Sequence, residues 1–291
     1  MSSHHLITHS AWIPSVSIPF RSTSPSSYKN THHLHHNLNT KEIYQTRERE
    51  RAAKMASTEG KEQKTPGRPM LMGQTILEKG AAMMQSLKPI KHVSQHACTF
   101  AIYSHDMSRQ IETHHMVSRL NEDFLQCAIY DSDDRSGRLI GVEYIISDRL
   151  FKALPQEEQK LWHSHAYEIK SGLWVTPRVP EAVAKPELDR LAKTYGKCWC
   201  TWQVDRGDVL PMGEPALMMS PQPDLPGAVR PELVKKRDDK YSVKTESLGA
   251  LRVDVTGPIW INPNADYWRK NGKGFKVDVV LTEMKRHAPF T

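Results

Sequence analysis

Alternation of apolar and polar residues predicts most of the strands of this chain. Seven short runs are rich in β-branched and aromatic residues, and turn-forming residues bound several of them. They are residues 95–103, 124–130, 139–146, 173–176, 197–204, 216–219 and 247–255. The turn-rich residues 131–137 separate the second run from the third, so these two runs are expected to form a hairpin.

Helical periodicity predicts several short helices between the strands, each with a start or stop signal. Helices are expected over residues 75–87, 147–154, 155–164, 187–195 and 231–241, and a turn or short helix over 106–115. Ser147 can cap the second helix and Gly196 the fourth. The whole pattern predicts an α+β fold, in which a single domain has a mostly antiparallel sheet and several short flanking helices.

Residues 161–172, Leu-Trp-His-Ser-His-Ala-Tyr-Glu-Ile-Lys-Ser-Gly, are the densest group of chemically capable side chains in the sequence. Apolar and histidine positions recur there at i, i+4 spacing, and Gly172 is a credible C-terminal cap, so the end of the preceding helix is the favoured structure. In a strand, His163 and His165 would share one face and Glu168 would point away.

Two histidines two residues apart, with a carboxylate nearby, can bind a divalent metal ion. Candidate ligands are His163, His165 and Glu168, with His105, His114 or Glu112 as a third ligand from elsewhere and His115 as a further site residue. The spacing is similar to the His-x-His and downstream Glu of metal-binding β-barrels. Here the glutamate falls one residue closer than in that pattern, and the flanking glycines differ.

Two other interpretations of these histidines stay open. They can be structural, with hydrogen bonds at a half-buried seam between helix and sheet. Alternatively, His163 or His165 can act as a general base that Glu168 orients. The sequence has no Gly-x-Ser-x-Gly, no phosphate-binding glycine loop and no His-Glu-x-x-His, so it assigns no catalytic residue and no cofactor beyond a divalent metal. Enzymatic activity is not expected.

The first 54 residues differ from the remainder of the chain. They hold no glycine and seven of the fifteen histidines, and without apolar periodicity they are expected to be disordered. Residues 47–51, Arg-Glu-Arg-Glu-Arg, are what a GA repeat encodes, which favours a translated leader with Met55 as the start over an organellar transit peptide. A flexible tail is expected over 55–70, the α+β domain over 71–260, and a C-terminal tail, packed on the domain or partly loose, over 261–291.

Charge and apolar content narrow the class of protein. Of the net charge of +7, residues 1–54 supply +4 (seven Lys and Arg against three Glu) and the remainder +3, too little and too evenly spread for nucleic-acid binding. No run approaches the ~20 apolar residues of a transmembrane helix. Four scattered cysteines predict no disulfide framework, which favours a reducing, intracellular setting. Oligomeric state is not indicated.

The predicted helix over residues 75–87 carries an apolar face that could serve either of two purposes. It could contact a lipid surface, or it could pack on its own domain, which its weakly basic polar face favours. The lipid-contacting residues would be Ile76, Leu77, Met83, Met84 and Leu87.

Several further stretches occur together and in order: Asn121-Glu-Asp before Gln126-Cys-Ala-Ile-Tyr-Asp, Leu139-Ile-Gly-Val-Glu-Tyr, residues 161–172, Thr194-Tyr-Gly-Lys, Trp202-Gln-Val-Asp-Arg-Gly-Asp and Leu217-Met-Met. In these motifs the chain resembles the plant oil body-associated proteins, a family distinct from oleosins. The resemblance covers residues 55–252.

The resemblance implies a seed protein of the oil body (lipid droplet) surface and the cytoplasm, concerned with droplet structure and stability and without established enzymatic activity. Its partners would be the droplet surface or oil body proteins. Since the sequence shows no hydrophobic hairpin able to enter oil, peripheral attachment is expected, through the helix over 75–87 or through a partner. The alternative is a metal-binding protein or metal-dependent enzyme that uses His163, His165 and Glu168.

Overall fold

The computed structural model describes residues 65–224 and 227–285. The predicted extension over residues 1–54, the start at Met55 and most of the tail over 55–70 lie outside them. Residues 65–70 form no helix or strand. Within the described part of the chain, no helix combines the length and the apolar content needed to cross a membrane.

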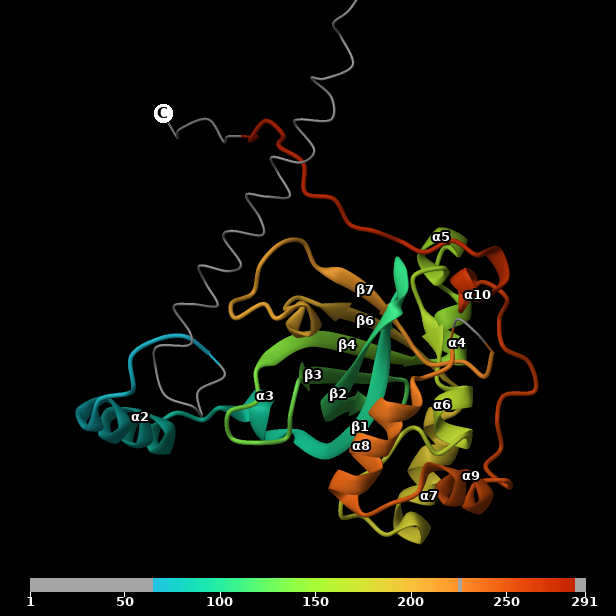
Figure 1. Cartoon of the computed structure of the whole chain (residues 1–291), viewed down its shortest axis with the longest axis horizontal. Coiled ribbons are helices and arrows are strands. Elements are labelled where there is room, and N and C mark those ends of the chain that lie inside the picture. The colour runs from blue at the N-terminus through green and yellow to red at the C-terminus, as the bar shows by residue number, and fades with distance from the viewer. Residues whose placement is uncertain (1–64, 225–226, 286–291) are drawn as a thin grey trace, which may run out of the picture. The chain divides into compact units, whose positions relative to one another are not determined.

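Six antiparallel strands close into a barrel (Figure 1). The described residues form seven strands, of which all but β5 belong to the barrel. They are β1 (Val93–Tyr103), β2 (Asp106–Asn121), β3 (Phe124–Tyr130), β4 (Leu139–Ser147), β5 (His163–Ser164), β6 (Thr194–Cys200) and β7 (Ala216–Met219). Their order is β4-β3-β2-β1-β7-β6, and β4 pairs again, from Gly141 to Ser147, with the whole length of β6. The two-residue β5 is added to the edge of β6. The predicted α+β class with an antiparallel sheet is confirmed, whereas closure of the sheet was not predicted.

Short helices surround the barrel, and Figure 1 shows α6 to α9 gathered on one side of it. The helices are α2 (Met72–Met84), α3 (Lys88–Lys91), α4 (Asp148–Lys152), α5 (Gln156–Gln159), α6 (Ala166–Lys170), α7 (Glu181–Leu191), α8 (Pro231–Tyr241), α9 (Thr245–Leu251) and α10 (Tyr267–Asn271), with a 3₁₀ turn, η1, at Val204–Arg206. As predicted, the Ser147 hydroxyl caps α4 by accepting from the Leu150 amide.

Three predicted elements are wrong. Residues 106–115, predicted as a turn or short helix, belong to β2, which pairs with β1 and β3 and is partly covered on both faces, so no clean alternation marks it. The predicted helix over 187–195 is displaced: α7 starts at Glu181 and ends at Leu191. It ends early because Thr194 and the following residues pair with β4 as part of β6. The predicted strand over 247–255 is largely α9.

Two buried arginines hold the chain after α6 out of regular structure. Arg252 donates to the carbonyl oxygens of Ile169 and Trp174, and Arg237 donates to that of Leu173. Since these carbonyls are taken by side chains, the predicted strand over 173–176 is reduced to a single bridge between Val175 and Cys98.

The favoured helical reading of residues 155–164 is also wrong at its end. The helix α5 stops at Gln159, and His163 and Ser164 form β5 beside β6. The Asp266 carboxylate accepts from both the amide and the hydroxyl of Ser164, at 3.0 and 2.6 Å, which fixes this segment as extended. Gly172, with φ of 85°, does follow the C-cap of the next short helix, α6, as expected.

Candidate functional site

Side chains inside the barrel form two apolar layers with a polar layer between them. Because side chains alternate along a strand, every second residue points inward. The apolar layer next to α6 and α7 contains Ala97, Val117, Leu125, Cys127 and Ile145. The layer at the other end contains Ala101, Tyr103, Ile111, Ile129, Cys198 and Cys200. Between the layers, the inward positions carry Thr99, Thr113, His115, Glu143 and Gly196, all of them buried.

The predicted residues His163, His165 and Glu168 enter this polar layer from one segment. Pairing of β5 with β6 sets His163 opposite Gly196. His165 is the N-cap residue of α6, and Glu168 lies in the first turn of that helix. All three side chains are buried, so the structure brings together the two predicted histidines and the predicted glutamate.

Glu143 is the centre of the resulting cluster. One carboxylate oxygen, Oε1, lies 2.9 Å from His163 Nε2 and 3.4 Å from His165 Nε2. The other, Oε2, lies 2.9 Å from His115 Nδ1. His165 Nε2 is also 3.8 Å from an oxygen of Glu168. We call these five residues the His–Glu cluster.

Threonine hydroxyls hold the outer sides of the cluster. The Thr99 hydroxyl donates to Glu168 at 2.6 Å. The outer nitrogen of His165, Nδ1, lies 2.8 Å from the Thr194 hydroxyl, and His115 Nε2 lies 3.0 Å from that of Thr113. Each of these side chains is therefore fixed on the side that faces away from the cluster centre.

Burial and neighbouring charges shift the pKa values in opposite directions. Burial alone would raise the pKa of Glu143, but the three imidazoles around it hold that pKa well below its usual value. Burial raises the pKa of Glu168, which has fewer cationic neighbours. The pKa of His163 is raised, because its bond to Glu143 outweighs the lowering effect of burial. Ionisation is therefore easier for Glu143 than for Glu168, and Glu143 favours a proton on His163.

Little empty space remains in the polar layer. A cavity of about 10 Å³, close to the volume of one water-sized sphere, is bordered by His115, Glu143, His163 and Glu168. A Cβ at Gly196 would come within 2.2 Å of Glu143 Oε1, 2.6 Å of His163 Nε2 and 2.7 Å of His165 Nε2. Because Gly196 has no side chain, the carboxylate of Glu143 and the imidazoles of His163 and His165 can come together there. The cavity is large enough for a proton or a single ion.

The other predicted histidines lie elsewhere. His105 is exposed in the turn between β1 and β2, and partial loss of solvent together with the charge of Arg109 lowers its pKa. His114 points to the outer face of β2, where it contacts His96 at 3.1 Å and Glu112 at 3.2 Å. Burial and His114 lower the pKa of His96 to about 4. Of the predicted further residues, only His115 joins His163 and His165.

Sequence reasoning missed Glu143 as a site residue. It stands in β4 between exposed Val142 and Tyr144, in phase with buried Gly141 and Ile145. A carboxylate at an inward position of a strand is rare without a partner, so the alternation around Glu143 could have indicated a site residue. Gly196 was read only as a helix cap, although its role is to make room for the cluster.

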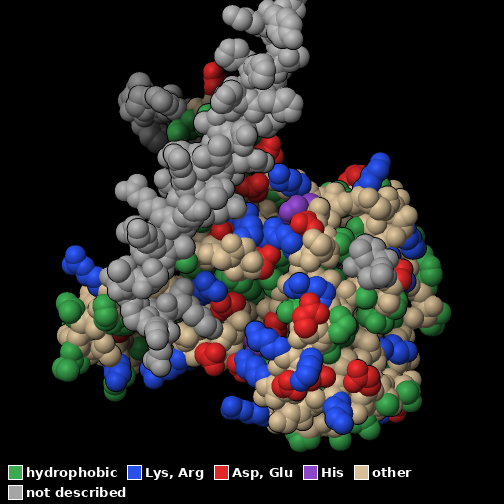
Figure 2. Space-filling model, viewed as in Figure 1, with side chains coloured by type: hydrophobic (Ala, Val, Ile, Leu, Met, Phe, Trp, Pro, Cys, Tyr) green, Lys and Arg blue, Asp and Glu red, His purple; other side chains and the backbone are tan. Residues whose placement is uncertain are grey.

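The helix α2 buries none of its residues. The expectation that it packs on its own domain is therefore wrong for the described part of the chain. The predicted lipid-contact residues Ile76, Leu77, Met83 and Met84 are all exposed on it. Leu87 lies beyond the helix, with φ of 42° at the start of α3, and is only partly exposed. Figure 2 shows hydrophobic side chains gathered over α2.

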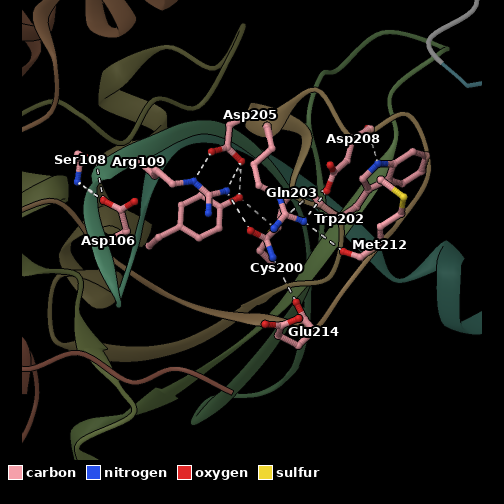
Figure 3. A network of polar contacts seen from close by, with 12 residues as sticks. Asp106, Ser108, Arg109, Cys200, Trp202, Gln203, Asp205, Asp208, Met212 and Glu214 are labelled. Carbon is pink, nitrogen blue, oxygen red and sulfur yellow. Dashed lines mark hydrogen bonds and ion pairs between the residues drawn. The ribbon is translucent and has the colours of Figure 1, made fainter. Parts of the chain in front are cut away.

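A second polar network lies at the end of the barrel near η1 (Figure 3). The Arg109 guanidinium donates to both carboxylate oxygens of Asp205, at 2.7 and 2.8 Å, and to Gln203 at 3.0 Å. Its plane lies 3.9 Å from the centre of the Tyr103 ring, whose hydroxyl donates to Asp205 at 2.6 Å. We call these four residues the Arg109–Asp205 network.

Comparison with known proteins places the chain among plant relatives. Residues 87–256 match the family described as "Protein of unknown function (DUF1264)". The chain is 62% identical to oil body-associated protein 2A of Zea mays, over 77% of this chain and 90% of the relative. It is 59% identical to oil body-associated protein 2A of Arabidopsis thaliana, over 83% and 98%, and 40% identical to oil body-associated protein 1B of Arabidopsis thaliana, over 81% and 95%. No solved structure matches it.

Proposed function

We propose, since this chain belongs to the oil body-associated protein family, that it is a peripheral protein of the oil body surface that contributes to droplet structure and stability. The exposed apolar face of α2 carries this proposal. We further propose that this face is the lipid contact.

The apolar side chains of α2 lie on one side of the helix. At about 100° per residue, Met72, Ile76, Leu77, Met83 and Met84 fall within an arc of roughly 140°. All five are between 65 and 88% exposed, namely Met72 (82%), Ile76 (65%), Leu77 (73%), Met83 (88%) and Met84 (84%). The opposite side carries the polar residues Gln74, Thr75 and Glu78, and Lys79 lies at the edge of the apolar arc, next to Met72. Such a helix can lie in the plane of a lipid surface with its apolar side immersed.

The energetics favour an oil surface over a charged membrane. Full burial of one such side chain stabilises by roughly 1.5–3 kcal/mol, so partial immersion of four supplies roughly 4 kcal/mol. The helix α2 carries one acidic and one basic residue, Glu78 and Lys79, so attraction to anionic headgroups adds little. Binding through this helix is therefore expected to change little with salt concentration.

The test compares two full-length variants with matched numbers of changes in α2. In the first, Ile76→Gln, Leu77→Gln, Met83→Gln and Met84→Gln make the apolar side polar while keeping good helix formers. In the control, Thr75→Gln, Glu78→Gln, Lys79→Gln and Ala82→Gln change the remaining surface. Each protein is mixed with protein-free droplets of triacylglycerol and phospholipid, and the fraction that floats with the droplets is measured.

We expect the floating fraction of the first variant to fall at least tenfold and that of the control to equal the floating fraction of the parent protein. Equal flotation of both variants would show that α2 is not the lipid contact. Binding only to native oil bodies, and not to protein-free droplets, would show that attachment requires a partner protein.

A further inference from the structure

We propose that the His–Glu cluster is a binding site for one divalent first-row transition-metal ion, coordinated by Glu143, His163 and His165. The site includes the two predicted histidines but replaces Glu168 by Glu143 as the carboxylate ligand. This inference does not depend on droplet attachment.

The hydrogen bonds of His165 place the proton of its neutral ring on the outer nitrogen. The Thr194 hydroxyl donates its only hydrogen to the Leu191 carbonyl, at 2.7 Å. It can therefore only accept from His165 Nδ1, 2.8 Å away, which makes Nδ1 the protonated nitrogen. In the neutral ring, the lone pair on Nε2 then faces carboxylate oxygens of Glu143 at 3.4 Å and Glu168 at 3.8 Å. Lone pairs that converge in this way are stabilised by a cation between them, and a metal ion can take the place of a proton there.

A second observation points to a missing partner in the same place. Glu143 Oε2 and His115 Nδ1 are both buried, and no hydrogen-bond partner is found for either among the described residues. They lie 2.9 Å apart, so their separation allows a bond, but their alignment does not meet hydrogen-bond geometry. Buried polar atoms without partners are rare in folded proteins. Both atoms border the small cavity.

The separations between donor atoms fit a coordination shell. Bonds of about 2.0–2.1 Å to nitrogen and oxygen, at angles of about 90–109°, place neighbouring donors about 2.9–3.4 Å apart. Glu143 Oε1 lies 2.9 Å from His163 Nε2 and 3.4 Å from His165 Nε2. One ligand atom from each of these three residues lies within 4.8 Å of the others.

The donor types narrow the choice of ion. Imidazole nitrogen with one carboxylate suits Zn²⁺ or Fe²⁺ and does not suit Ca²⁺ or Mg²⁺, which prefer oxygen. Cys127 and Cys198 also lie near Glu143, and Cys127 forms a separate group of potential ligands with His115 and Glu143. The proposed shell contains imidazole and carboxylate donors, and the Co²⁺ spectrum described below tests the exclusion of sulfur.

Metal analysis of the full-length protein tests the site. The parent protein, purified without a metal-affinity step, is expected to carry about one ion per chain more than Glu143→Gln. The N-terminal histidines are present in both proteins, so the difference isolates the barrel. Metal-free parent protein should also bind Co²⁺ with visible bands of nitrogen and oxygen donors. An intense thiolate charge-transfer band would overturn the donor set.

A variant outside the coordination shell keeps the test decisive if Glu143→Gln does not fold. Thr194→Val removes the acceptor that orients His165 and is expected to weaken Zn²⁺ binding by about 10–100-fold. The matched control is Thr201→Val, whose hydroxyl donates to the Ile140 carbonyl away from the cluster, and it should bind Zn²⁺ as the parent does. Affinity is measured by competition with a chromogenic chelator.

Three results would overturn the proposal. The first is a folded parent protein that binds no Co²⁺ or Zn²⁺ beyond Glu143→Gln. The second is equal Zn²⁺ affinity in Thr194→Val and Thr201→Val. The third is loss of the ion in a His96→Asn, His114→Asn double variant, which would place it at the outer face of β2 instead.

Discussion

The His–Glu cluster and the Arg109–Asp205 network both place opposite charges in a barrel, but they satisfy them differently. In the network, a guanidinium fork meets a carboxylate in bidentate geometry, and Gln203 takes a further hydrogen. In the cluster, Glu143 contacts three imidazoles. Two buried atoms, Glu143 Oε2 and His115 Nδ1, lie in contact but form no hydrogen bond.

The contrast separates a structural role from a binding role. A charge pair whose donors and acceptors match already reaches its stable state in the protein alone, and the network ties the start of β2 to η1. In the His–Glu cluster, by contrast, lone pairs of the imidazoles and carboxylates point into a small space, and they are stabilised only when a cation is present there. The network is also partly exposed, with side chains 20% and 18% accessible, whereas the cluster is sealed.

The largest expected effect is that of Glu143→Gln. Removing the carboxylate that contacts three buried imidazoles leaves them without their nearest counter-charge, so the free energy of unfolding should fall by about 4 kcal/mol. Guanidinium unfolding followed by tryptophan fluorescence measures it, with chelator in both samples so that a bound ion does not contribute. A loss below about 1 kcal/mol would mean that Glu143 does not balance the charge of the cluster.

Gly196→Ala tests the crowding of the same site. The added methyl group would lie under 3.0 Å from three cluster atoms, and pairing on both sides of β6 resists movement, so a loss of about 3 kcal/mol is expected. The control, Gly80→Ala in α2, meets no atom within 4 Å and should change unfolding by less than about 1 kcal/mol. Equal unfolding curves for both variants would contradict the tight packing described for the cluster.

Asp205→Asn makes the same carboxylate-to-amide change in the other region. It weakens the bidentate pair with Arg109, and because solvent reaches both groups the expected loss is about 2 kcal/mol or less. Metal content and Co²⁺ spectrum should not change, since Asp205 contacts none of the cluster residues. Loss of metal in this variant would remove the distinction between the two regions.

The smallest effect expected is a pH dependence in the network. Burial opposes ionisation of Asp205, but Arg109 and Tyr103 together hold its pKa below the usual value. The resulting stability is fully present above about pH 4, the range of an unfolded aspartate, and is lost as the pH falls through the lowered pKa. The stability difference between parent and Asp205→Asn should therefore shrink on acidification below about pH 4. A difference that grows instead would contradict the lowered pKa.

Local patterns predicted elements well wherever the residues facing the core are apolar. The bounds of β3, β7 and α8 match the predicted 124–130, 216–219 and 231–241. In β3, buried and half-buried positions alternate along the strand. The first part of β2 was missed because polar residues, Thr113 and His115, occupy buried inward positions there, so no apolar alternation marks the strand.

The candidate site was predicted in part for a similar reason. His163, His165 and Glu168 lie within one short segment, so their proximity could be read from spacing. His115 was named without a reason to prefer it over His114, because the choice depends on which face of β2 points into the barrel. Glu143 comes from another strand, and no spacing links it to the histidines.

By itself, the sequence determined the α+β class, the hairpin of β3 and β4, the amphipathic α2 and the histidine pair, since each depends on residues close together along the chain. Only the tertiary structure decided the rest. Pairing of β4 with β6 closes the barrel and places Glu143 beside Gly196. Pairing of β5 with β6 places His163 opposite the same glycine. Such convergence depends on contacts between distant segments, whose packing overrides local preference.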